Sequence, residues 1–146
     1  MWEIARPELL HTVFDIVLSG FIGSLVTIYF TRSHERTQVS LDIIREYRAL
    51  YHDLGVALGL LKHPDLLSAV DNQNKVKAIG NWYDIVSTLW LAKEANERLL
   101  KTFGIHKSAR NFREMAEKAS RGQEWLRVAV EEKWKGLAAV ARKGED

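Results

Sequence analysis

Apolar residues dominate the first thirty positions of the chain, before the pattern becomes periodic. The stretch at residues 13–30, VFDIVLSGFIGSLVTIYF, contains a single charge, Asp15. As a helix, the wider apolar window at residues 9–31 is about 34 Å long, and the hydrocarbon core of a bilayer is about 30 Å thick. The pattern therefore predicts a transmembrane helix at residues 13–31, preceded by a short extracytoplasmic N-terminus at residues 1–12. The alternative is a helix buried in a soluble core.

One half of this predicted helix carries small and polar residues. With successive residues about 100° apart, that half contains Asp15, Ser19, Gly20, Gly23, Ser24 and Thr27. Helices in lipid associate where small residues let their backbones approach, so this half is expected to contact other copies of the chain or to line a pore. Asp15 lies near the end of the span, so its carboxylate either faces the oligomer or pore or reaches the headgroups.

The rest of the chain shows helical spacing and no strand pattern. Apolar residues recur at steps of three and four from Ser40 to Leu61, and His63-Pro64-Asp65 ends that helix. The fold class expected is all-α: a single N-terminal transmembrane helix followed by a cytoplasmic helical bundle at residues 32–146. The predicted bundle helices after the proline are residues 64–70, 75–103, 108–121 and 123–143, with a polar loop at 71–74 and a stop at Gly104.

The charge distribution orients the predicted span. Only Arg6 precedes it, whereas four arginines follow between residues 32 and 48, so the positive-inside rule places the N-terminus outside and the C-terminal domain in the cytoplasm. This predicts a single-pass protein of the inner membrane, with the lipid bilayer as one partner. The net charge of +2 is too small to suggest DNA binding. The absence of cysteine excludes disulfides and thiolate metal sites.

Motifs of catalysis are missing from the sequence. It has no Walker loop, GxSxG, HExxH or glycine fingerprint. The five histidines are dispersed, and acidic pairs such as Asp42 and Glu46 are typical of a solvated helix face. We therefore expect a protein that is not an enzyme and that needs no metal or other cofactor.

Residues 98–113, RLLKTFGIHKSARNFR, contain five cations and no acid, interleaved with Phe103 and Phe112. If Ser108 caps a helix here, free backbone N–H groups at the helix start attract phosphate or carboxylate, and the aromatic rings can stack on a base. The alternative is a solvated basic loop, or one that meets acidic headgroups or an acidic neighbour. The predicted ligand-binding residues are Lys101, His106, Lys107, Ser108, Arg110, Asn111 and Arg113.

The order of VFDIVLSGFIGSLVTIYF, a long helix and a small helical domain with KTFGIHKSARNFR resembles the small membrane effectors of prokaryotic phage defence. The resemblance, to effectors associated with type III CRISPR systems, implies a homo-oligomer whose cytoplasmic domains bind cyclic tetra-adenylate or another anionic nucleotide and perturb the membrane. It carries over no binding residues. Around NWYDIVSTLWLAKEANERLLKTFGI the chain also resembles uncharacterised bacterial proteins with one span and a helical bundle. A membrane-anchored adaptor that docks a partner protein is the alternative function, and a phage-type lysis protein is a third.

Overall fold

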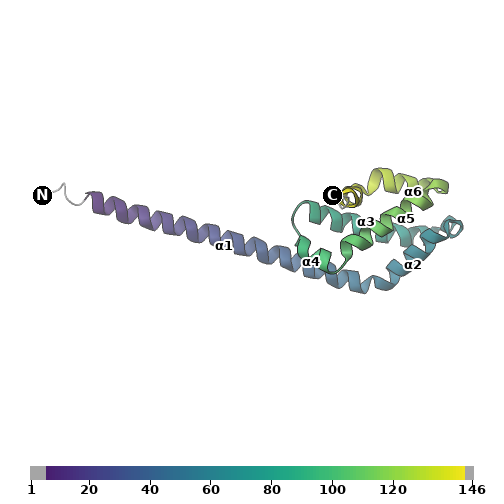
Figure 1. Cartoon of the computed structure of the whole chain (residues 1–146), viewed down its shortest axis with the longest axis horizontal. Helices are drawn as coiled ribbons and strands as arrows, with labels where there is room; N and C mark the ends of the chain where they lie inside the picture. Colours follow the sequence, from purple (N-terminus) through teal and green to yellow (C-terminus); the bar gives the residue numbers. More distant parts are fainter. Residues whose placement is uncertain (1–5, 144–146) are drawn as a thin grey trace. The chain divides into compact units, whose positions relative to one another are not determined.

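The computed structural model describes the backbone of residues 6–143 and the side chains of residues 19–143, and all of its regular structure is helical (Figure 1). The all-α prediction is therefore confirmed for the described residues. The α-helices are α1 Arg6–Ala49, α2 Tyr51–Lys62, α3 Val70–Leu91, α4 Glu97–Thr102, α5 Ile105–Ala119, α6 Glu124–Val128 and α7 Lys135–Arg142. Short 3₁₀ helices at Pro64–Ser68 (η1) and Ser120–Gly122 (η2) and a π-helix at Ala129–Lys133 (η3) complete the chain.

The chain divides into two compact units, residues 1–35 and 36–146. Helix α1 supplies the described part of the first unit, and its last turns belong to the second. The boundary lies four residues after the predicted end of the transmembrane helix at residue 31.

The transmembrane prediction is not supported. Among the residues that the structure describes, no helix is both long and apolar enough to cross a bilayer. The predicted transmembrane helix, the single-pass topology and the inner-membrane location are therefore corrected. Asp15 lies outside the residues whose side chains are described.

Several of the predicted helix boundaries differ from those in the structure. The helix expected from Ser40 to Leu61 breaks at Leu50, between α1 and α2. The loop expected at residues 71–74 is instead the first turn of α3. There the side-chain amides of Asn72 and Gln73 donate hydrogen bonds of 2.8 and 3.0 Å to carbonyl oxygens at the end of η1. These polar side chains close the preceding turn rather than forming a loop of their own.

The helix expected at residues 75–103 is also two helices, because α3 ends at Leu91 and α4 begins at Glu97. Lys93 takes a left-handed backbone conformation between them, with φ of 58°. The Asn96 side chain then accepts a bond from the Leu99 N–H at the start of α4. The Asn96 backbone N–H donates to the Oγ of Ser40, a fully buried residue on α1, over 2.6 Å. This bond fixes the connection to a helix more than fifty residues earlier.

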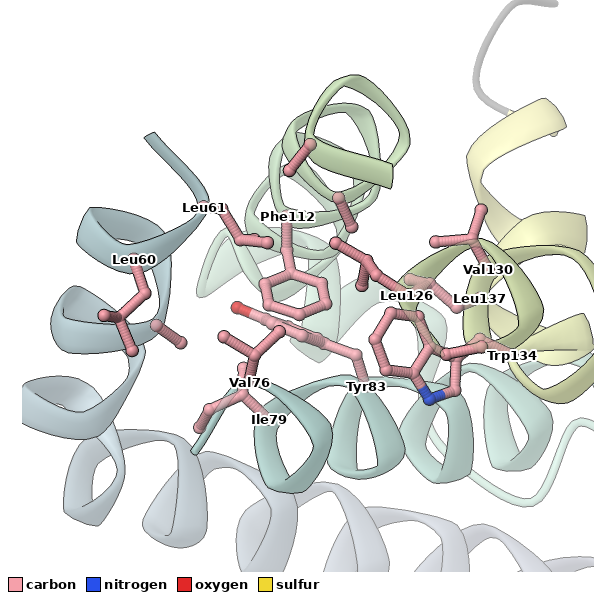
Figure 2. Packing of buried hydrophobic residues seen from close by; sticks show 14 of the residues in the cluster. Leu60, Leu61, Val76, Ile79, Tyr83, Phe112, Leu126, Val130, Trp134 and Leu137 are labelled. Carbon is pink, nitrogen blue, oxygen red and sulfur yellow. The ribbon is translucent and has the colours of Figure 1, made fainter. Parts of the chain in front are cut away.

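The buried core of the second unit lies between α2, α3, α5 and α7 (Figure 2). The rings of Tyr83, Phe112 and Trp134 pack in sequence, with centroids 5.3 and 5.7 Å apart. Trp134 follows the π-helix, and its indole N–H donates to Asn81 Oδ1 over 2.9 Å. The indole lies against Gly80 of α3, where a Cβ atom would be 2.0 Å from Trp134 Cζ2. The helix predicted at residues 123–143 is thus interrupted at η3 and Trp134.

Candidate anion-binding site

Helix α5 contains the second half of the basic segment, and it has a buried face and an exposed face. Its buried residues are all apolar; they are Ile105, Ala109, Phe112, Ala116 and Ala119. Gly104 precedes it with a φ of 70°, a conformation that glycine adopts without strain. Helix α5 therefore begins at Ile105, and Ser108 lies in its first turn rather than at the cap as the sequence suggested.

A groove of about 470 Å³ runs along the outer face of α5. It is lined by Gly104, Lys107, Ser108, Arg110, Asn111 and Glu114. The groove lies at the start of a fifteen-residue helix, where the first backbone N–H groups have no partner within the helix. Two cations, one amide and one acid thus surround it.

A second, smaller groove of about 230 Å³ separates α5 from α7. Its lining is Arg110, Arg113, Glu114, Glu117, Ala138, Ala141 and Arg142. Arg113 Nε donates to Glu117 Oε1 over 2.7 Å, whereas Arg113 Nη1 is buried without a hydrogen-bond partner. Arg110 lines both grooves, and its Nε is also buried without a partner. A buried donor without an acceptor costs about 1–3 kcal/mol, so both guanidinium groups have a hydrogen bond still to donate.

The pKa of His106 lies below its ordinary value. Burial lowers its pKa, and the nearby cations Arg110 and Lys101 lower it further. The ring packs edge-on against Trp90, with centroids 4.9 Å apart. His106 is therefore a neutral group beside a positive patch, and it does not line either groove.

The structure divides the remaining predicted ligand-binding residues among three places. Lys107, Ser108, Arg110 and Asn111 come together in the larger groove, and Arg113 lies in the smaller one. Lys101 is on α4, where its ammonium pairs with Glu97 over 2.7 Å and lowers the pKa of that carboxyl.

Two side-chain groups that were expected to contact the ligand point into the core instead. The Ser108 hydroxyl lies 2.6 Å from the hydroxyl of Tyr83, whose pKa is raised by burial. Phe112 is completely buried, so its ring is not available to stack on a base. Phe103 remains 41% exposed but lies outside both grooves, with Arg48 over its ring.

Glu114, Glu117 and Arg142 are the charged lining residues that sequence reasoning missed. Glu114 is the first acid after the basic segment and follows Arg110 by one helical turn, so the 3.6-residue period was a usable signal. Arg142 is twenty-nine positions after Arg113, and only the packing of α7 on α5 brings it near. Among the described residues, no group of three or more histidines and acids is placed to hold a metal ion.

Comparison with known proteins gives no relative. No protein family matches the chain, and neither a curated protein nor a solved structure is significantly similar to it. The site must therefore be interpreted from its own chemistry.

Proposed function

We propose that this protein is a non-enzymatic helical module that binds an anionic nucleotide of the oligoadenylate class along α5. The observation that carries the proposal is the position of Arg110. It lines both grooves, its Nε has no partner, and Lys107, Arg113 and Arg142 lie in the same two linings. Hydrogen bonds between guanidinium and phosphate are among the strong ones in proteins.

The size and polarity of the larger groove suit such a ligand. Small-molecule sites occupy about 300–1,000 Å³, and the groove is about 470 Å³. The Asn111 amide supplies both a donor and an acceptor for a base edge. Glu114 accepts hydrogen bonds from amino or hydroxyl groups and disfavours an anion that brings charge alone. The lining therefore favours a nucleotide over inorganic phosphate or sulfate.

A thermal-shift experiment on the full chain tests this proposal. The panel is cyclic tetra-adenylate, linear tetra-adenylate, AMP and inorganic phosphate. A nucleotide at about 100 times its Kd stabilises the folded state by about 2.7 kcal/mol. Arg110→Ala should weaken binding about tenfold or more, since a hydrogen bond to a charged group contributes about 1.5–3 kcal/mol.

Lys118→Ala is the matched control for that experiment. It removes one positive charge from the same helix about 12 Å further along than Arg110, and Lys118 lines neither groove. The proposal predicts that Lys118→Ala keeps the ligand-induced shift and Arg110→Ala loses it. No shift with any nucleotide, or equal loss in both variants, would reject the α5 site.

An adaptor that docks partner proteins is the second candidate function. It is favoured by a different observation, the exposed apolar side chains of α1 between Phe21 and Phe30. Binding of a nucleotide distinguishes the two candidates, because the adaptor function requires none.

A further inference from the structure

A groove of about 300 Å³ lies between α3 and the segment formed by α6 and η3. It shares no lining residue with the two grooves on α5. Two lysines, one amide, two indoles and small aliphatic side chains line it; among them are Lys77, Asn81, Trp125, Val128, Lys133 and Trp134. Small-molecule sites begin at about 300 Å³, so the groove has room for a small ligand.

The polar side chains of this groove offer hydrogen-bond donors. The ammonium groups of Lys77 and Lys133 only donate, and neither forms an ion pair with a described residue. No acid is among the described residues that line the groove. The Asn81 amide oxygen already accepts the indole N–H of Trp134, which leaves the NH₂ group as a further donor. A ligand here must therefore supply acceptors, and two positive charges favour an anion.

Trp125 adds an indole N–H that is buried and has no hydrogen-bond partner among the described residues. Such unpaired buried donors are rare in folded proteins. The Lys77 ammonium lies over the same ring, 5.0 Å from its centroid, so a positive charge and an unpaired donor occupy one part of the groove. Trp125 is only partly buried as a residue, and the χ2 torsion of tryptophan has a broad minimum. A small rotation of the ring therefore brings the N–H to a ligand in the groove.

One wall of the groove is the π-helix η3. Its first and last residues, Ala129 and Lys133, both line the groove. The Trp134 backbone N–H donates to the Ala129 carbonyl over 2.9 Å and closes the wide turn. Single π-helical turns are rare and frequently occur at functional sites. Val128 and Ala129 add an apolar surface beside the cations, so the lining suits a ligand with an anionic end and an apolar body.

We propose that this groove binds a small organic carboxylate with an apolar body. The carboxylate oxygens accept hydrogen bonds from the ammonium groups of Lys77 and Lys133 and from the indole N–H of Trp125. The apolar body packs on Val128 and Ala129. The proposal is independent of the nucleotide site on α5, because the two sites share no residue.

Titration of the full ¹⁵N-labelled chain with 3-phenylpropionate, observed at the tryptophan indole N–H resonances, tests the proposal. The chain has five tryptophans, and the resonance that is missing from Trp125→Phe identifies Trp125. This resonance should move downfield and saturate, because its N–H gains an acceptor. The neutral 3-phenylpropionamide should bind at least tenfold more weakly, and 3-phenylpropylamine and inorganic phosphate should leave the resonance in place.

Lysine variants test the charge. Lys133→Gln changes an exposed residue and should weaken binding about tenfold or more, as expected for the loss of one charge-assisted hydrogen bond. Lys77→Gln should do the same. Lys75→Gln is the matched control; Lys75 is also on α3 but lines a different groove, and its loss should leave the affinity unchanged.

Four outcomes would overturn the proposal. They are a Trp125 resonance that does not move, an equal response to inorganic phosphate, which would indicate an adventitious ion only, and equal weakening by Lys75→Gln and Lys133→Gln. The fourth is a set of backbone shifts confined to α5, which would place the carboxylate in the other grooves.

Discussion

Substitution of Gly80 tests the packing that holds α3 against the last helices. Gly80→Ala would place a methyl group 2.0 Å from Trp134 Cζ2, whereas carbon atoms pack at about 3.5–4.0 Å. The ring would have to move by about 1.5 Å or more. Trp134 is only 2% exposed and its indole N–H is bound to Asn81, so the movement disturbs the core and that hydrogen bond together.

The magnitude follows from two opposing effects. Overpacking costs about 1–3 kcal/mol, and a strained or lost hydrogen bond adds about 1 kcal/mol. The gain from replacing glycine by alanine within a helix is about 0.8–1.0 kcal/mol. We expect a net loss of about 1–3 kcal/mol. In a unit of about 110 residues this lowers Tm by roughly 4 °C per kcal/mol.

Gly59→Ala is the control for this prediction. Gly59 lies within α2, and nothing is within 4 Å of an added Cβ. The same chemical change should therefore raise stability by about 0.5–1 kcal/mol. Unfolding in urea, followed by circular dichroism, measures both variants. If Gly80→Ala is as stable as the parent or more stable, the contact between Gly80 and Trp134 is wrong.

Two further predictions concern the groups around α5. Tyr83→Phe and Ser108→Ala should each destabilise the fold by about 1–3 kcal/mol, because each breaks the 2.6 Å hydrogen bond between the two hydroxyls, and Ser108→Ala leaves the buried hydroxyl of Tyr83 without a partner. A double-mutant cycle by urea unfolding should give a coupling of at least 0.5 kcal/mol, and additive losses would exclude that bond. For His106, whose folded-state pKa is lowered, the unfolded chain takes up the proton first as the pH falls below about 6.5, so stability decreases from there down to the folded-state pKa. His106→Gln should flatten that part of the stability profile, and an unchanged pH dependence would contradict the assignment.

The sequence predicted well those features that depend on neighbouring residues. Gly104 ends one helix because a left-handed residue closes it, and Pro64 opens a short new one, at η1. Leu50 interrupts a continuous apolar stripe, and no local residue signals the break. The connection between α3 and α4 depends on the bond from Asn96 to Ser40, which is a tertiary contact.

In the candidate site, too, spacing along one helix was predictable and contacts between helices were not. The cations Lys107 and Arg110 share a groove because they are one turn apart on one helix, which spacing predicts. The direction of the Ser108 hydroxyl depends on Tyr83, twenty-five residues earlier, and the place of Phe112 depends on its contacts with Tyr83 and Trp134. Helical period alone does not separate a residue at the edge of a polar face from one directed into the core.

Backbone amide mapping by nuclear magnetic resonance tests the central claim, nucleotide binding on α5, most directly. Titration of the full, isotopically labelled chain with cyclic tetra-adenylate should give saturable shifts concentrated between Gly104 and Glu114, with the Arg142 amide as the distant responder across the smaller groove. The same titration of Lys118→Ala should reproduce the map, and Arg110→Ala should require about tenfold more ligand. Shifts that never saturate, or that concentrate elsewhere in the second unit, would contradict the account.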